Sequence, residues 1–312
     1  MTLPNGTILI TGGGISNLVY QIYFSSSHPY RYHQQIKIVQ KPPMNQSRKE
    51  HASVFLRDAV YVLGGYDGMT NGFLNSCERF DLENNEWTPV SNMLIPKCAF
   101  GVATLANRYI FTLGGYDGND RLSSIEKYDI QTDKWTLLEA KLKQPLSNSA
   151  CFSHSDNSIV ILGGGYNSGF CLETNQLNVN DNTWKQLPPM TDGRDLRNKI
   201  VSINGNVYAI GGHNCIAEKF SMKKGTWQLL SSYKEFLDDN LDSWSCALYY
   251  ETTRKLEEMK NNIVQQPEIK ISRHQPQNFH QNYENNYDNY DNFDNPYLDE
   301  ILSDDSGIEE WM

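Results

Sequence analysis

The sequence predicts an all-β fold, a β-propeller of five blades, followed by a C-terminal tail outside it. The first observation is a glycine pair that recurs at spacings of 52, 50, 49 and 48 residues. Self-similarity with a period near 50 residues is typical of propellers. The second observation is a tryptophan downstream of four of these pairs. The pairs are Gly12-Gly13, Gly64-Gly65, Gly114-Gly115, Gly163-Gly164 and Gly211-Gly212, and the tryptophans are Trp87, Trp135, Trp184 and Trp227.

Each repeat contains four segments with the character of strands. A β-branched or aromatic run such as Val60–Leu63 precedes each glycine pair, and in four repeats another such run lies upstream, as Ala52–Leu56 does. An aromatic strand and then the tryptophan strand follow the pair, which completes the four antiparallel strands of a blade. The first repeat has no tryptophan, and Ile36–Val39 is expected to form its last strand.

Two successive repeats carry three matched motifs. They contain Gly-Gly-Tyr-Asp-Gly at 64–68 and 114–118, an acidic-basic-aromatic-Asp run at 78–81 and 126–129, and a tryptophan at 87 and 135. This combination resembles the kelch repeat, over about residues 5–250, and is closest to the propeller half of kelch-like substrate adaptors. Glycine permits close backbone approach and tryptophan supplies apolar area between blades, so structural roles are expected for Gly64, Gly65, Trp87, Gly114, Gly115, Trp135, Gly163, Gly164, Trp184, Gly211, Gly212 and Trp227.

The ends of the repeat region depart from this pattern. The fourth repeat lacks the acidic-basic pair and is aligned with Leu177-Asn178-Val179-Asn180 in its place. The first repeat begins at its glycine strand, so that strand is expected to lack an upstream neighbour. We expect a strand at Trp244–Tyr250 to join the first blade beside Thr7–Ile10 and close a five-bladed ring. Six blades are the alternative, because six is the commoner number in kelch propellers.

The charge distribution places a boundary near residue 250. Residues 251–312 hold 14 acidic and 5 basic residues, so they carry −9 of the net charge of −10. Residues 1–250 are predicted to form the propeller, 251–264 a short helix, and 265–312 a disordered acidic tail rich in Asn, Asp and Tyr.

Composition also excludes several functions. The acidic balance argues against binding to nucleic acid, and no apolar run approaches the roughly 18 residues of a membrane span. The N-terminus does not resemble a signal peptide, which predicts a cytoplasmic protein. The six cysteines show no zinc-ligand spacing and are expected to be reduced, buried thiols.

No motif predicts a catalytic, metal or cofactor site. The seven histidines form no metal-binding signature, so no cofactor is expected. The leading hypothesis is a non-catalytic protein-interaction module, acting as a scaffold or as the substrate-recognition part of a ubiquitin ligase. The alternative is a small-molecule enzyme at the propeller mouth, similar to galactose oxidase or to sugar epimerases.

Candidate partner-binding residues lie on the loops that follow the glycine pairs and on those that precede each blade. The resemblance implies that the tyrosine after the glycine pair lines a partner-binding mouth, and that adaptor activity uses a separate BTB/cullin subunit. The residues assigned to the first set are Tyr66, Tyr116, Tyr166, His213 and Asn214. The second set occupies one register in successive repeats and comprises Glu50, Ala99, Asn148 and Arg197, of which Arg197 suits a partner carboxylate.

Two truncations test the predicted boundary. Ending the chain after residue 265 should leave the melting temperature nearly unchanged, because the tail contributes little core. Ending it after residue 242 should remove the closing strand, expose a sheet edge and promote aggregation. Thermal unfolding and light scattering measure both effects, and equal behaviour of the two truncated chains would contradict the boundary.

Overall fold

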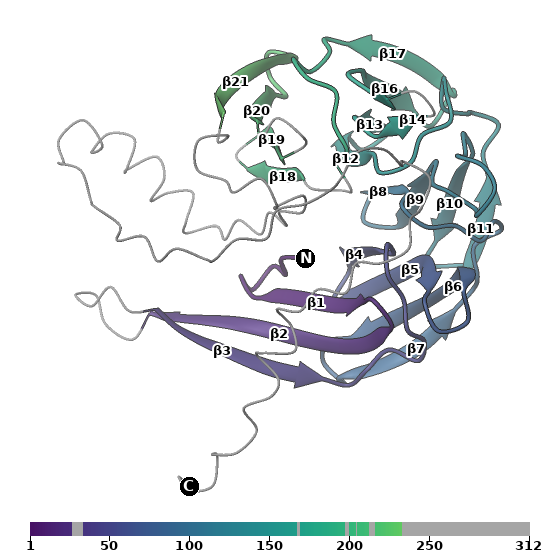
Figure 1. The fold of residues 1–312 in the computed structure, drawn as a ribbon, viewed down its shortest axis with the longest axis vertical. Helices are drawn as coiled ribbons and strands as arrows, with labels where there is room; N and C mark the ends of the chain where they lie inside the picture. The colour runs from purple at the N-terminus through teal and green to yellow at the C-terminus, as the bar shows by residue number, and fades with distance from the viewer. Residues whose placement is uncertain (27–33, 167–168, 197–199, 204, 212–215, 233–312) are drawn as a thin grey trace, which may run out of the picture. The chain divides into compact units, whose positions relative to one another are not determined.

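Strands account for all the regular structure in the described part of the chain. The computed structural model describes residues 1–26, 34–166, 169–196, 200–203, 205–211 and 216–232. Five antiparallel sheets follow one another in chain order (Figure 1), which confirms the five-bladed β-propeller. The predicted closing strand at Trp244–Tyr250, the helix at 251–264 and the tail at 265–312 lie outside the described residues.

Four of the sheets contain four strands each. The second comprises β4 (Ala52–Leu56), β5 (Ala59–Asp67), β6 (Gly72–Asp81) and β7 (Glu86–Val90). The third comprises β8 (Gly101–Leu105), β9 (Tyr109–Leu113), β10 (Ile125–Asp129) and β11 (Lys134–Leu137). The fourth comprises β12 (Ala150–Ser155), β13 (Ser158–Leu162), β16 (Thr174–Asn178) and β17 (Thr183–Leu187). The fifth comprises β18 (Ile200–Ile203), β19 (Asn206–Gly211), β20 (Ile216–Ser221) and β21 (Thr226–Ser232). A short ribbon of β14 (Gly165–Tyr166) and β15 (Gly169–Phe170) extends the loop between β13 and β16.

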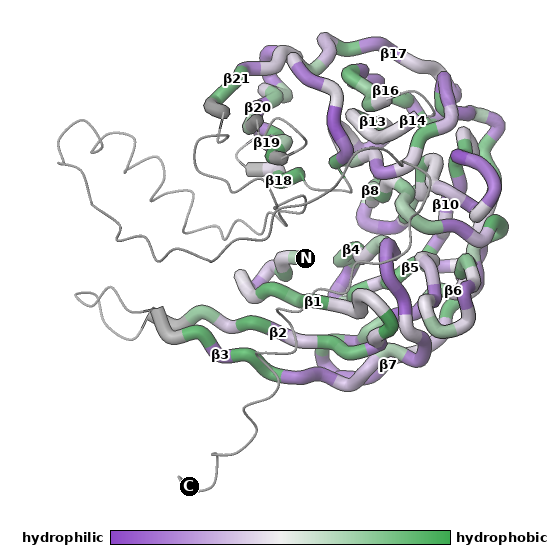
Figure 2. Tube along the Cα trace, viewed as in Figure 1, coloured by the Kyte–Doolittle hydropathy of each residue, from purple (hydrophilic) through white to green (hydrophobic). Residues whose placement is uncertain are grey.

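The core lies between neighbouring sheets. Figure 2 shows hydrophobic runs along the strands and hydrophilic connections between them. One cluster joins Tyr61 and Leu63 of the second sheet to Ile110, Tyr128 and Trp135 of the third. Trp87 and Trp135 belong to this core, as predicted. The ring centres of Trp87 and Phe80 are 4.8 Å apart, and those of Trp135 and Tyr128 are 5.0 Å apart. Such aromatic pairs add about 0.5–1.5 kcal/mol each beyond the area they bury.

The first glycine of the pair is required by close backbone approach. Gly64 has φ of 53°, and a Cβ there would lie 2.8 Å from the carbonyl oxygen of Lys97, in the segment that enters the next sheet. The second glycine, Gly65, has φ of 104° and donates its N–H to that same carbonyl at 2.9 Å. The glycine pair therefore allows the close backbone approach that the sequence predicted, and this approach joins one blade to the next.

The first sheet has three strands, β1 (Ile8–Gly13), β2 (Ser16–Ser26) and β3 (Gln34–Lys41), and β3 supplies the predicted last strand. As expected, no strand lies upstream of its glycine strand among the described residues, although Thr2 and Ile8 form an isolated antiparallel bridge there. The Met1 amino group donates to the Leu9 carbonyl at 2.7 Å, and Leu9 N–H donates to the Met1 carbonyl at 2.8 Å. A tight turn at Pro4-Asn5-Gly6, closed by Leu3 N–H donating to the Thr7 carbonyl at 2.8 Å, brings the first residues back along β1.

One face of the first sheet is apolar and exposed. Ile10 and Ile38 are 46% and 58% exposed. Their registers match those of Val62 and Trp87 in the second sheet, which are buried against the first sheet. Among the described residues, no sheet covers this face of the first blade in that way.

The register of the fourth sheet corrects the alignment made from sequence. Leu177 of β16 pairs with Trp184 of β17, as Phe80 pairs with Trp87. The acidic-basic position of this repeat is therefore Asn175-Gln176, and not the run Leu177-Asn178-Val179-Asn180. The apolar Leu177 took the place of the aromatic residue, a substitution that spacing within one repeat did not reveal.

Buried cation–glutamate pairs anchor the segments that enter three of the blades. Arg48 Nη2 lies 2.6 Å from Glu78 Oε1, and Lys97 Nζ lies 2.8 Å from Glu126 Oε1. Arg194 pairs with Glu218 in the fifth sheet, and all six side chains are at most 4% exposed. The glutamates also accept backbone hydrogen bonds, as Glu78 does from Asn45 at 2.7 Å. In the Arg48–Glu78 pair, the hydrogen bonds that both side chains make offset the free energy of burying the two charges.

Removing one charge of such a pair should destabilise the propeller strongly. Glu78→Gln leaves the Arg48 guanidinium buried without its counter-charge, and we expect a loss of about 3–5 kcal/mol in the free energy of unfolding. Urea denaturation measures this loss. The exposed Glu83→Gln is the control and should stay within about 0.5 kcal/mol of wild type. A loss below about 1 kcal/mol for Glu78→Gln would contradict an anchoring role.

Candidate functional site

The two sets of loops selected from the sequence meet at one face of the blades. Tyr66 N–H donates to the Lys49 carbonyl at 2.8 Å, and Lys49 N–H donates back to the Tyr66 carbonyl at 2.9 Å. Tyr116 and Cys98 exchange the same two bonds in the third blade, both at 2.9 Å. Each loop after a glycine pair is therefore paired with the segment that enters its own blade.

An aromatic row links the second and third blades on this face. The ring of Phe73 lies 5.1 Å from that of Tyr66 and 5.6 Å from that of Tyr116, edge to face in both cases. All three side chains are half-exposed. The structure thus brings Tyr66 and Tyr116 onto either side of Phe73, which the sequence analysis did not single out. We call these three residues the aromatic row.

Local contacts hold the aromatic row in place. The Tyr66 hydroxyl donates to Asn71 Oδ1 at 2.9 Å, and the Tyr116 hydroxyl donates to the Gly118 carbonyl at 2.8 Å. Phe73 lies over Gly118, where a Cβ would come within 2.6 Å of its ring. The last glycine of the Gly-Gly-Tyr-Asp-Gly motif is thus the signal that a large side chain from the preceding blade occupies this place.

The aspartate of the same motif orders the loop beneath the row. Asp67 Oδ1 accepts bonds from the Ser47 hydroxyl at 2.6 Å and Met69 N–H at 3.0 Å, and Oδ2 accepts one from the Thr70 hydroxyl at 2.9 Å. These donors, above all the Ser47 hydroxyl, lower the pKa of Asp67 to about 2. The carboxylate therefore stays charged throughout the neutral range and fixes the loop that carries Tyr66.

Large apolar side chains are exposed beside the row. Met69 is 71% exposed in the loop of the second blade, and Ile15 is 67% exposed in that of the first. Ile15 lies against Gly68, where a Cβ would be 3.1 Å from its Cγ2. The side chain from the first blade thus packs on the motif glycine of the second, as Phe73 of the second packs on Gly118 of the third. Apolar area with polar groups around it is typical of a protein-binding surface.

A chain of backbone hydrogen bonds connects the residues that precede the blades. Ala99 N–H donates to the Glu50 carbonyl at 2.9 Å, and Asn148 N–H donates to the Ala99 carbonyl at 2.6 Å. All three residues have φ between 53° and 57°, a left-handed conformation that is uncommon outside glycine. Their shared register confirms that the sequence placed Glu50, Ala99 and Asn148 at equivalent positions, and Glu50 is exposed there.

Two assignments made by register need correction. Leu196 N–H donates to the Asn148 carbonyl at 3.0 Å, so Leu196, and not Arg197, holds the equivalent place in the fifth blade. In the fourth blade Gly165 makes the paired bonds with Ser147 that Tyr66 makes with Lys49, so Tyr166 lies one residue further along. Leu196 stands 15 residues before its glycine pair, as Ala99 and Asn148 do, whereas Arg197 stands 14 before it, as Glu50 does. A third glycine at 165 causes the shift of Tyr166. Arg197, Gly212, His213 and Asn214 lie outside the described residues.

A hydroxyl–imidazole contact lies near the inner edge of the first blade. His51 Nε2 is 2.8 Å from Thr11 Oγ1, which is 3.0 Å from Ser53 Oγ. Burial, and after it the charge of Arg48, lowers the pKa of His51 to about 3, so its imidazole is neutral near pH 7. No carboxylate bonds to its Nδ1 within the described structure, so nothing there orients the ring as a catalytic base requires.

Other chemistry is absent from the described residues. They contain no group of three or more His, Cys, Asp or Glu side chains placed to hold a metal ion. The four cysteines among them, Cys77, Cys98, Cys151 and Cys171, are buried free thiols, as expected. In the described part of the chain, no helix is long and apolar enough to cross a membrane.

Comparison with known proteins agrees with the repeat motifs. A family model described as the KLHDC2/KLHL20/DRC7 Kelch-repeats domain matches residues 1–214. The chain belongs to the kelch-repeat family. Mouse Kelch-like protein 23 is 27% identical over 205 residues, which are 65% of this chain and 33% of that protein. Rat Kelch-like protein 7 is 36% identical over 96 residues, 30% of this chain and 15% of its own length.

The relatives are longer than the part of them that matches this chain. A Kelch repeat and BTB domain-containing protein of Caenorhabditis elegans is 33% identical over 124 residues, 38% of this chain and 21% of its own. The chain thus spans about a third or less of the curated relatives named here. The solved structure of YjhT matches with a TM-score of 0.53 and 14% identity, covering 62% of this chain and 68% of YjhT, which supports the fold.

The order of the loop that carries Tyr66 should depend on pH through Asp67. Because its pKa is lowered on folding, the carboxylate stabilises the folded state above about pH 4, and this contribution is lost as the pH falls toward 2. We expect Asp67→Asn to reduce stability near neutral pH and to converge on wild type near pH 2. Urea denaturation across this range measures the difference, with the exposed Asp58→Asn as control. A difference that does not change with pH would contradict the assignment.

Proposed function

We propose that this kelch domain is a non-catalytic protein-binding module that captures its partner on the face bearing the aromatic row. The observation that carries this proposal is the row itself, with three half-exposed rings spanning two blades and Met69 exposed beside it. Rigid aromatic side chains offer large contact area at modest entropic loss and are enriched at the centres of interfaces.

The surrounding polar residues suit the rim of such an interface. Glu50 and Asn148 stand at equivalent places in the segments that enter the second and fourth blades. Lys49 Nζ lies 5.2 Å from the centre of the Tyr66 ring. We include Glu50, Asn148, Tyr166, Arg197, His213 and Asn214 in the proposed partner-binding surface. A surface with both charge signs and amide groups matches a mixed polypeptide better than a purely acidic one.

A role in substrate recognition follows from the relatives rather than from the site. One relative carries kelch repeats and a BTB domain in its name, and others are named Kelch-like. We propose that the domain selects proteins for a ubiquitin ligase in the cytoplasm, with a BTB/cullin subunit recruiting the enzyme. A scaffold role uses the same surface and differs in whether captured proteins become ubiquitinated.

A double substitution in the aromatic row tests the surface. A photocrosslinking residue at Met69 should first identify the partner, while the same residue at Leu137, 50% exposed on β11, serves as the control. Tyr66→Ala with Tyr116→Ala should then weaken binding of the purified partner by about 1–2 kcal/mol, because both aromatic contacts are lost. Calorimetric titration measures the affinity, and thermal unfolding shows whether the fold is intact.

The outcomes separate the alternatives. A folded double variant that binds its partner with wild-type affinity, or crosslinks obtained from position 137 and not from 69, would place the binding surface elsewhere. A double variant that unfolds would show that the tyrosines serve packing; Tyr66→Phe with Tyr116→Phe, which keeps the rings, would then distinguish packing from contact through the hydroxyl groups.

A further inference from the structure

The fourth blade lacks the buried cation that three other blades contain. A shared bond identifies the equivalent residues, because the second glycine of each preceding pair donates its N–H to their carbonyl. Gly13 donates to Arg48 at 3.0 Å, Gly65 to Lys97 at 2.9 Å, Gly115 to Leu146 at 2.8 Å and Gly164 to Arg194 at 2.9 Å. Leu146 therefore occupies the place that a basic side chain takes in the second, third and fifth blades.

The residues that would accept hydrogen bonds from a cation at this position also differ between the fourth blade and the second. Asn175 pairs with Ile161 in the sheet register in which Glu78 pairs with Val62, so an amide replaces the carboxylate. Two residues earlier, Glu173 stands at the register of Ser76, whose hydroxyl accepts a bond from Arg48 at 3.2 Å. Compared with the second blade, the carboxylate of the fourth blade therefore lies two residues earlier in the chain, and a leucine stands in place of the cation.

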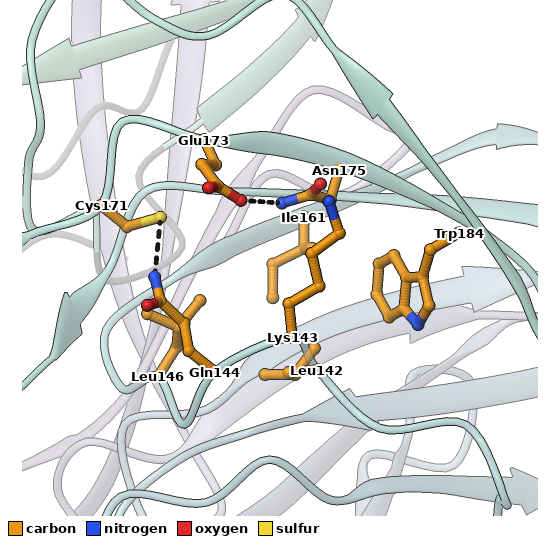
Figure 3. A pocket seen from close by; sticks show the side chains of 9 residues that line it. All are labelled: Leu142, Lys143, Gln144, Leu146, Ile161, Cys171, Glu173, Asn175 and Trp184. Carbon is orange, nitrogen blue, oxygen red and sulfur yellow. Dashed lines mark hydrogen bonds between the residues drawn. The ribbon is translucent and has the colours of Figure 1, made fainter.

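A small pocket lies at this position (Figure 3). Leu142, Leu146 and Ile161 form apolar walls, the Trp184 ring lies across from Glu173, and Asn175 and Glu173 supply polar atoms. Asn175 is 8% exposed; its Nδ2 donates to Glu173 Oε2 at 2.9 Å, and its Oδ1 is buried without a partner. The pocket leaves about 10 Å³ for the centre of a water-sized group, which is room for one ammonium group.

The charges around the pocket leave an acceptor without its cation. The Glu173 carboxylate is half-buried, and burial raises the pKa of the neighbouring Cys171 thiol, which therefore remains neutral. Lys143 also lines the pocket, where Figure 3 shows its side chain. This residue is nevertheless exposed and takes part in none of the ion pairs within 4.0 Å among the described residues. An unpartnered buried carbonyl oxygen beside a carboxylate calls for a donor that carries positive charge.

We propose that this pocket binds a primary alkylammonium group, either a free amine or the lysine side chain of a partner protein. The ammonium donates to Asn175 Oδ1 and to the Glu173 carboxylate, so it takes the place of the cation that Leu146 lacks. The free space admits only the ammonium group, so the alkyl stem lies outside it, and the Trp184 ring in the pocket lining offers an aromatic face that favours a cation. Lys143 is the internal competitor. This site is separate from the aromatic row and does not rest on its role.

The indole N–H of Trp184 provides a direct spectroscopic probe. Titration with n-butylammonium should shift the Trp184 indole signal in a nitrogen–proton correlation spectrum saturably, and Trp184→Phe identifies that signal by its loss. The Trp135 signal, from the blade whose Lys97–Glu126 pair is intact, should not move. n-Butanol, which has a similar shape but no charge, should shift neither signal.

Three substitutions test the assigned contacts. Asn175→Leu should weaken n-butylammonium binding by at least about tenfold, because a hydrogen bond to a charged group is lost, and unchanged Trp135 and Trp87 signals would show that the fold is kept. Lys143→Met should tighten binding by removing the competitor, whereas the exposed Lys141→Met should have no effect. Equal binding of butanol and butylammonium, or full binding by Asn175→Leu, would overturn the proposal.

A further titration identifies the source of the ammonium. Nα-acetyl-lysine N-methylamide presents the lysine side chain with its ammonium and without free termini, and its binding supports recognition of a partner's lysine. Binding of n-butylammonium but not of this lysine derivative supports a free amine as the ligand. Failure of both probes to shift the Trp184 signal overturns the site, whatever the outcome for the aromatic row.

Discussion

A buried cation beside a glutamate holds the segment that enters a blade in a fixed place, and much of the molecule depends on that contact. In the second blade the Arg48 guanidinium donates to the Gly64 carbonyl at 2.8 Å and to the Ser76 carbonyl at 3.0 Å in addition to Glu78. One side chain therefore ties the entering segment to two strands of its own sheet. Because a buried charge without these partners is very unfavourable, the segment has few alternative positions.

The loop face follows from this anchor. Lys49 and Glu50 come directly after Arg48, and the hydrogen bonds between Lys49 and Tyr66 then place the loop that carries the aromatic row. Glu50, Ala99 and Asn148 accept a left-handed backbone, which allows each to bond to its counterpart in the next blade. A face built from such constraints presents a prearranged surface, so binding would order few additional groups.

The fourth blade shows what happens when the anchor is replaced. Leu146 fills the place of the cation with an apolar side chain, and replacing a buried ion pair by apolar groups is often tolerated. The replacement is incomplete here, because Asn175 and Glu173 remain as acceptors. The same backbone geometry therefore supports a closed structural pair in three blades and an acceptor-lined pocket in one.

The sequence by itself determined the blade architecture, because glycine pairs and tryptophans act locally and recur at a regular spacing that can be counted. It also placed Tyr66 and Tyr116 on neighbouring blades, and Glu50, Ala99 and Asn148 at one register. A further signal was present but missed: Arg48, Lys97 and Arg194 stand 16, 17 and 17 residues before the glycine pairs of their blades. Their glutamate partners are 24 to 30 residues away, so spacing within a motif did not connect them.

Tertiary structure alone decided the register of Gly165 and Leu196, the position of Phe73 between two tyrosines and the return of Met1–Leu3 along β1. Each depends on hydrogen bonds or side-chain contacts between distant segments, and a shift of one residue alters those contacts while leaving the local pattern almost unchanged.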